Sequence, residues 1–183
     1  ALALKKDKRL PYKVKNLVIM GGCMAVPGNV SPYAEANIFG DAKAADMVFK
    51  AGFHMTVAGL DVTMKTYITG QDLELLGKYC KEENKAVISY LKEALAFYFK
   101  FNHESGGFLD SCVLHDPLAM LIAEDPSLGE YRMLRLGVEY ESEPFRGMIK
   151  SDERFETEFD HDEILYCTKV DSGLAVRRLL SVF

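Results

Sequence analysis

The feature that most constrains the fold is a short apolar run, Leu17-Val18-Ile19-Met20, that ends in Gly21-Gly22. Four apolar residues closed by glycines are typical of a strand buried in a parallel sheet, with a loop at its carboxyl end. A second such run covers residues 55–60. Between the two runs, Asp41 is predicted to cap a helix that continues to about residue 51. This alternation predicts an open α/β sheet.

The rest of the chain continues the alternation and ends in a region richer in strands. Helices are predicted over 71–80, 84–101 and 116–123, strands over 136–140, 146–150 and 164–170, and a last helix capped by Asp171. In the helix over 84–101, apolar residues recur at i, i+3, i+4 and i+7, which predicts one core-facing stripe. That stripe comprises Val87, Ile88, Leu91, Leu95, Tyr98 and Phe101. We therefore expect a mostly parallel open sheet with flanking helices and an appended β-hairpin, forming one domain over 1–183.

Ligands of open α/β sheets bind outside the carboxyl ends of the strands. This rule places three segments on one candidate rim: the polar loop from Gly21 to Asn37, the residues after Asp61, and the turn at His115-Asp116.

Charge and cysteine usage exclude some classes of function. The 22 basic and 27 acidic residues give a net charge of −5, which argues against a nucleic-acid partner. No apolar run reaches the length of a membrane span. The four cysteines are far apart with no C-x-x-C pair, which favours buried reduced thiols and a cytoplasmic protein, although two disulfides in a secreted domain stay possible. They are Cys23, Cys80, Cys112 and Cys167.

The polar loop carries the first candidate residues, Glu35 and Asn37, with Asn29 nearby. In extended backbone, side chains two residues apart point the same way, so a carboxylate and an amide there could grip neighbouring hydroxyls. The alternative is structural: Asn29 shapes the loop, and Glu35 caps a helix or is solvated.

His115-Asp116-Pro117 is the second candidate. His115 is the best general-acid candidate, because the unperturbed pKa of histidine lies near neutrality. The alternative is that Asp116 is the N-cap of a helix and His115 a loop residue. His103, at the end of the long helix, either interacts with the helix dipole or lies above a binding site. His161 lies in an acidic stretch and is expected to be solvated.

Taken together, these segments resemble the calcium-dependent nucleoside hydrolase family, and the plant-type variant in particular. The resemblance rests on segments in the family's order: Met20-Gly21-Gly22, Gly28-Asn29-Val30-Ser31-Pro32, Ala34-Glu35-Ala36-Asn37-Ile38-Phe39, Gly59-Leu60-Asp61-Val62-Thr63, Leu114-His115-Asp116-Pro117, Val138-Glu139 and Arg146-Gly147-Met148. It implies hydrolysis of the N-glycosidic bond of uridine- or inosine-type ribonucleosides by a calcium-bound water, through an oxocarbenium-like state.

The resemblance also implies residue roles. Glu35 and Asn29 resemble the groups at the ribose 5′-hydroxyl end, Asn37 a ribose hydroxyl ligand, and Met20 the apolar residue under the sugar. Asp116 resembles a calcium carboxylate. His115 resembles the residue that faces the leaving base, and His103 is added as a further substrate-binding candidate.

One departure from the family pattern carries further expectations. The family's Asp-rich motif, D-x-D-x-x-x-D-D, supplies the general base and two metal carboxylates, and these 183 residues contain no counterpart. We therefore expect the C-terminal part of a nucleoside hydrolase domain, without its N-terminal strands, that is active only with an N-terminal segment or companion chain and forms a dimer or tetramer. The alternative is a catalytically inactive fragment or paralogue with an assembly or ligand-binding role.

Overall fold

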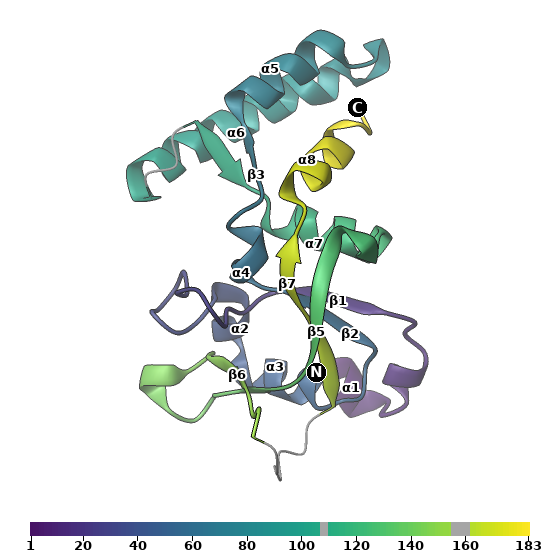
Figure 1. Cartoon of the computed structure of the whole chain (residues 1–183), viewed down its shortest axis with the longest axis vertical. Helices are drawn as coiled ribbons and strands as arrows, with labels where there is room; N and C mark the ends of the chain where they lie inside the picture. Colours follow the sequence, from purple (N-terminus) through teal and green to yellow (C-terminus); the bar gives the residue numbers. More distant parts are fainter. Residues whose placement is uncertain (107–109, 155–161) are drawn as a thin grey trace.

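The computed structural model describes residues 1–106, 110–154 and 162–183. The strands of the main sheet are β1 (Leu17–Met20), β2 (Met55–Ala58), β5 (Gly129–Val138), β6 (Ile149–Ser151) and β7 (Glu163–Val170). In the described residues they form a five-stranded sheet in the order β1-β2-β7-β5-β6 (Figure 1). β1, β2 and β7 are parallel, and β5 is antiparallel to both β7 and β6. The predicted open α/β sheet is confirmed.

Three predicted strands differ from the observed ones, and one of them, predicted over 146–150, is observed only as β6 at Ile149–Ser151. The hairpin strand predicted over 136–140 begins at Gly129, because β5 pairs with β7 along residues 129–135 before it pairs with β6. The hairpin is therefore a continuation of the main sheet and not an appendage to it. The strand predicted over 55–60 ends at Ala58, because the chain turns into the short helix α4 (Leu60–Thr63).

Helices cover both faces of the sheet. One face is covered by α1 (Leu2–Lys6), α2 (Ala36–Gly40) and α3 (Ala42–Phe49). The other face is covered by α4, α7 (His115–Glu124) and α8 (Ser172–Leu180). The side chains of β7 alternate between them, so that Tyr166 packs with α3 and Cys167 with α7. The predicted Asp41 and Asp171 caps are confirmed, since their carboxylates accept from the N–H groups of Ala44 and Leu174.

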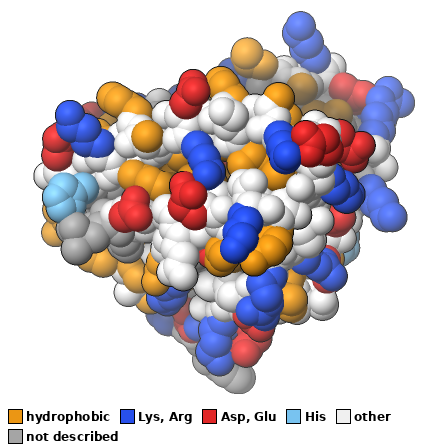
Figure 2. Space-filling model, turned by 90° about the horizontal axis from the view of Figure 1, so that it is seen from above, with side chains coloured by type: hydrophobic (Ala, Val, Ile, Leu, Met, Phe, Trp, Pro, Cys, Tyr) orange, Lys and Arg blue, Asp and Glu red, His pale blue; other side chains and the backbone are white. Residues whose placement is uncertain are grey.

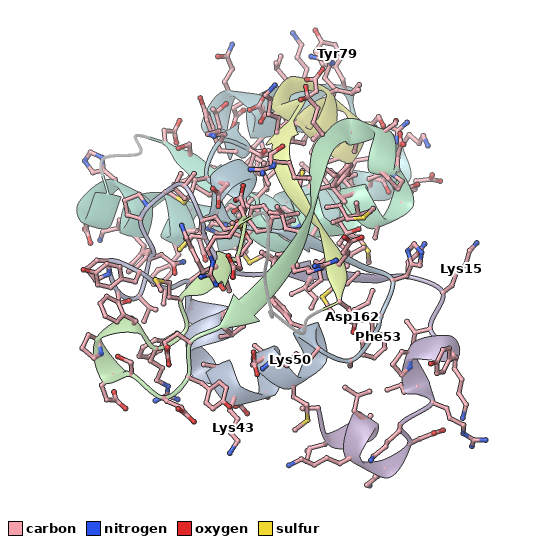
Figure 3. The ribbon with its side chains drawn as sticks, turned by 60° about the horizontal axis from the view of Figure 1, so that its bottom comes forward. Lys15, Lys43, Lys50, Phe53, Tyr79 and Asp162 are labelled. Carbon is pink, nitrogen blue, oxygen red and sulfur yellow. The ribbon has the colours of Figure 1, made fainter. Side chains whose placement is uncertain are left out.

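A second, smaller unit lies beyond the end of the sheet. It consists of the antiparallel pair β3 (Tyr67–Thr69) and β4 (Ser111–Val113) and the helices α5 (Gly70–Tyr79) and α6 (Lys85–Gly106). Its core contains Ile68, Leu73, Cys112 and Leu114. In Figure 3, Tyr79 at the end of α5 and Lys43 of α3 lie at opposite ends of the molecule. Single 3-10 turns occur at Leu10–Tyr12, Glu82–Asn84, Pro126–Leu128 and Glu143–Phe145.

The predicted single apolar stripe of α6 is wrong. Ile88 is buried and Leu95 and Phe99 pack on the small core, but Val87, Tyr98 and Phe101 are 46%, 49% and 56% exposed. The helix carries apolar residues on two faces, and periodicity alone does not say which face meets the core.

The cysteine prediction is confirmed for three of the four thiols. All four are free; Cys23, Cys112 and Cys167 are buried, whereas Cys80 is partly exposed. Among the described residues no helix is both long enough and apolar enough to span a bilayer.

Candidate functional site

The candidate site lies where β1 and β2 end side by side. The Gly21 N–H donates to the Ala58 carbonyl at 3.2 Å, and the Leu60 N–H donates to the Gly22 carbonyl at 2.9 Å. These two bonds join the loop after β1 to the turn after β2, at the edge of the sheet that the topology rule predicted.

Glu35 is the N-cap of α2, which was the structural alternative. Its Oε1 accepts from the Asn37 N–H at 2.8 Å, and its Oε2 from the N–H groups of Ile38 at 3.2 Å and Gly22 at 2.9 Å. The residue is 2% exposed. The extended-backbone argument for the pair was wrong, because Asn37 lies in the first turn of a helix. A carboxylate has about four acceptor positions, so Glu35 keeps roughly one for a ligand.

Asn37 and Met20 meet beside this cap. The Asn37 Nδ2 donates to both the carbonyl oxygen and the Sδ of Met20, each at 3.3 Å. In the described chain this leaves the Asn37 Oδ1 able to accept a hydroxyl from outside the protein. The Asn29 Oδ1 accepts from the Ala36 N–H at 2.9 Å and so fixes the loop that enters α2, which was the structural alternative for that residue.

Two glycines are required for this geometry. Gly22 has φ of +76°, a backbone region that favours glycine, and a Cβ there would lie 2.5 Å from the Ile149 Cδ1. A Cβ on Gly59 would overlap the Tyr166 hydroxyl. A side chain at Gly22 would displace Ile149 of β6, and one at Gly59 would displace the Tyr166 hydroxyl and the Gly22 carbonyl.

Asp61 and Tyr166 support the loop that follows β1. Neither was among the site residues predicted from the sequence. The Asp61 Oδ2 accepts from the Tyr166 hydroxyl at 2.6 Å and from the Met24 N–H at 3.0 Å, and its Oδ1 accepts from the Ala25 N–H at 2.8 Å. Burial, together with the bond to Asp61, raises the pKa of Tyr166, so the hydroxyl remains a donor. Both residues line a cavity of about 350 Å³. The available signal was an acidic residue just after a buried strand.

His115 is the first residue of α7, and its Nδ1 lies 2.8 Å from the Thr63 Oγ1. Burial lowers the pKa of His115, and the negative charges of Asp116 and Glu35 oppose that effect. The net effect favours the neutral form of the ring. The N-cap alternative for Asp116 is wrong: Leu114 occupies the cap position, and Asp116 lies exposed in the first turn.

The described residues do not by themselves fit a calcium ion. They contain no group of three or more His, Cys, Asp or Glu side chains placed to hold a metal. Calcium takes six to eight oxygen ligands. Asp116 could supply one carboxylate, whereas Glu35 already accepts three backbone bonds.

His103 stands apart from this group in the described structure. It lies exposed near the end of α6, and no contact in the described residues joins it to Met20, Glu35, Asn37 or His115. His161 lies outside the described residues.

Comparisons with known proteins give one consistent result. The family model described as inosine-uridine preferring nucleoside hydrolase matches residues 1–176. The chain is 39% identical over 132 residues to uridine nucleosidase 1 of Arabidopsis thaliana, which is 72% of this chain and 38% of that protein. It is 35% identical over 152 residues to the pyrimidine-specific ribonucleoside hydrolase RihA of Shewanella sp. strain ANA-3, which is 83% of this chain and 46% of that protein.

Two solved structures agree with the sequence matches. The plant nucleoside hydrolase PpNRh1 superposes with a TM-score of 0.87 at 32% identity, over 98% of this chain and 56% of that one. The purine-preferring ribonucleoside hydrolase from Gardnerella vaginalis gives 0.86 at 30% identity, over 98% and 55%. The matched part of the chain covers less than half of each curated relative named above, and the structural matches cover little more than half of each solved chain.

Proposed function

Because the chain belongs to the inosine-uridine preferring nucleoside hydrolase family, we propose that it takes part in hydrolysis of the N-glycosidic bond of ribonucleosides to ribose and a free base. The observation that supports this most is the convergence of Met20, Glu35 and Asn37 at the end of β1, with His115 held by Thr63 in the turn that follows the neighbouring strand β2. The relatives' names include uridine, pyrimidine and purine substrates, so uridine and inosine are both candidates.

Each residue has a proposed role that comes from the family resemblance and is compatible with its contacts. The Asn37 Oδ1 accepts a ribose hydroxyl, and Met20 lies under the apolar side of the sugar ring. Glu35 is proposed mainly to position Asn37, because its carboxylate fixes the start of the helix that carries Asn37. One acceptor position of the carboxylate remains for a hydroxyl of the substrate. Asn29 fixes the entry to that helix.

His115 is proposed to face the leaving base. If the Thr63 hydroxyl donates to Nδ1, the proton of the neutral ring lies on Nε2. From there the ring donates a hydrogen bond to the base and stabilises the negative charge that develops as the glycosidic bond breaks. His103 stays a substrate-binding prediction, and it would reach the sugar or base only if α6 approaches this rim.

Calcium is the proposed metal, with Asp116 as one oxygen ligand and the remaining ligands from a companion segment or chain. Two observations support a companion: the exposed Asp116 carboxylate, and β1, which pairs only with β2 in the described residues. Calorimetric titration of the isolated chain with calcium should then show no binding below millimolar concentrations, and binding should become measurable when the companion is present.

A second candidate function is a non-catalytic fragment or paralogue that binds a ligand or assembles with another protein. The observation that favours it is that Asp116 is unaccompanied by other candidate metal ligands in the described residues. Intact mass separates the two candidates at the outset, because this candidate predicts 20.5 kDa with no companion peptide.

The deciding experiment measures ribose release from uridine and inosine with added calcium, for the chain alone and mixed with the part of a plant relative that the chain does not match. We expect release only from the mixture, and loss of release when His115 is replaced by Ala. The absence of ribose release from a mixture that forms a stable complex would overturn the catalytic proposal.

A further inference from the structure

The turn between β5 and β6 contacts the segment that carries Glu35 and Asn37. We define the hairpin turn as residues 139–148. In Figure 1 it is drawn in light green and lies beside α2. Exposed hydrophobic side chains are common on this protein, and Figure 2 shows them among charged ones on the face seen from the α5–α6 end. Exposure alone therefore does not distinguish a functional surface, whereas specific contacts do.

Three consecutive residues of the hairpin turn make these contacts. The Phe145 ring packs edge-on against the Tyr33 ring, with the ring centroids 5.0 Å apart and an angle of 63° between the planes. The Arg146 guanidinium lies over the Phe39 ring, 5.2 Å from its centroid. Gly147 is buried, and it lies so close to α2 that a Cβ there would be 2.8 Å from the Phe39 Cα.

The contacts fall on both sides of Glu35 and Asn37. Tyr33 precedes the pair in the sequence, and Phe39 follows it. The helix α2 has only five residues, and a helix of that length is not stable without tertiary contacts. Ile38 holds its inner side in the core. The hairpin turn supplies the second set of contacts.

Hydrogen bonds brace the hairpin turn from within. The Glu139 Oε1 accepts from the N–H groups of Glu141 at 2.7 Å and Ser142 at 2.9 Å. The Gly147 N–H donates to the Glu139 carbonyl at 2.7 Å, and the Glu139 N–H donates to the Met148 carbonyl at 2.9 Å. A turn that is fixed to the sheet in this way also fixes the residues it contacts.

We propose that the three contact residues of the hairpin turn are positioning residues for ribose binding, because they hold α2 so that Asn37 faces the sugar. They act through α2 and do not touch the substrate. The Asn37 Nδ2 is bonded to Met20, so the direction of its Oδ1 depends on where α2 lies relative to β1. A shift of about 1 Å in a positioning group costs about 10²-fold in rate. For its substrate this inference rests on the proposed function, whereas the support of α2 does not.

Hydrogen exchange of the purified chain tests the support of α2 without substrate. Phe145→Ala removes one ring of the aromatic pair. The Asn37 and Ile38 amides, which donate to Glu35, should then exchange at least about fivefold faster, because their bonds open more often. The amides of α8 should keep their rates. Phe145→Tyr keeps the ring and should exchange like the wild type.

Glu143→Ala is the matched control. Glu143 lies exposed in the same turn, and in the described residues it forms no hydrogen bond, ion pair or ring contact with α2. Its substitution should leave the exchange of α2 unchanged. Circular dichroism checks that each variant keeps its helix content.

A double-mutant cycle on the mixture with the plant part tests whether the hairpin turn acts through Asn37. Phe145→Ala should raise KM for uridine about three- to tenfold and leave kcat within about twofold, because His115 is untouched. In the Asn37→Ala background the same substitution should change KM by less than about twofold, since the group it positions is absent. A general loss of stability would act equally in both backgrounds.

Unchanged exchange of Asn37 and Ile38 in Phe145→Ala would overturn the proposal, and so would an equal change in KM in both backgrounds. Arg146→Ala removes the contact on Phe39 and is an independent variant with the same expected results. A wild-type mixture that releases no ribose overturns the proposed function instead. The exchange rates then decide by themselves whether the hairpin turn positions α2.

Discussion

The Tyr166 hydroxyl donates a 2.6 Å hydrogen bond to the Asp61 Oδ2, and through it β7 supports the loop that follows β1. Both side chains are almost fully buried. Because the same carboxylate accepts from the Met24 and Ala25 N–H groups, one residue connects three segments that are distant in the sequence. The loop that presents Gly22 to Glu35 thus depends on a contact made more than 100 residues away.

The first prediction concerns this contact. Tyr166→Phe should lower the free energy of unfolding by about 2 kcal/mol, since a buried hydrogen bond to a carboxylate contributes about 1.5–3 kcal/mol. Asp61→Ala should cost at least about 3 kcal/mol, because it leaves several donors without their acceptor. Urea unfolding measures both. Tyr131→Phe is the control, since that hydroxyl bonds the Pro126 carbonyl at an exposed position and should cost less than about 1 kcal/mol. Equal losses for the two tyrosine variants would contradict the assignment.

The second prediction concerns the Glu35 cap. Glu35→Gln keeps the shape of the side chain, but its NH₂ group cannot accept, so at least one of three backbone donors faces another donor. The free energy of unfolding should fall by about 1–3 kcal/mol. Asp41→Asn is the control: asparagine keeps an oxygen for the Ala44 N–H and is an equally good N-cap. If Glu35→Gln unfolds at the same urea concentration as Asp41→Asn, the carboxylate is not the group that holds the loop.

The third prediction concerns His115 in the complemented protein. His115→Ala should lower kcat for nucleoside hydrolysis by about 10²–10⁴-fold, the range typical of a lost proton donor. Thr63→Val removes only the hydroxyl beside Nδ1, so a smaller loss of about tenfold is expected. Steady-state assays with uridine measure both.

Thr66→Val is the matched control for Thr63→Val. The Thr66 hydroxyl is also buried, but it contacts the Val62 carbonyl and Ser172 and not His115. Its kcat should stay within about twofold of the wild type. A loss as large as that of Thr63→Val would show that both substitutions act by loosening α4 and not by releasing the imidazole ring.

The fourth prediction concerns the thiols. Burial, with the nearby charges of Asp61 and Glu35, raises the pKa of Cys23 to about 11, and burial raises that of Cys167 to about 11. The thiolate is the reactive form, and at pH 8 such a group is only roughly 0.1% ionised. Brief treatment with iodoacetamide should therefore modify the partly exposed Cys80 first. Intact mass should show one adduct on the folded chain and four in urea. Rapid modification of Cys23 in the folded chain would contradict its burial.

Several features followed from local sequence because local physics determines them. The two strand–glycine runs, the Asp41 and Asp171 caps, and the placement of Glu35 and His115 at one sheet edge all depend on neighbours within a few residues or on a general rule of topology. The family resemblance depended on motifs that are themselves contiguous. These are the levels at which a single sequence is informative.

Other features depended on contacts that local sequence does not encode. The two apolar faces of α6 have similar periodicity, and only the positions of α5 and β4 decide that Ile88 and Leu95 face inward. Glu35 was identified as a site residue, but its backbone partners arise only when Gly22 is brought alongside by the sheet.

The sequence by itself therefore determined the fold class and the family and predicted a sheet edge for the candidate site, because strand patterns, caps and contiguous motifs are local. Only the tertiary structure decided which polar side chains spend their hydrogen-bonding positions on the backbone of the loops. A hydrogen-bond acceptor has few positions, and whether they are filled depends on which distant backbone reaches it. That is why Asp61 and Tyr166 emerged as supports of the candidate site.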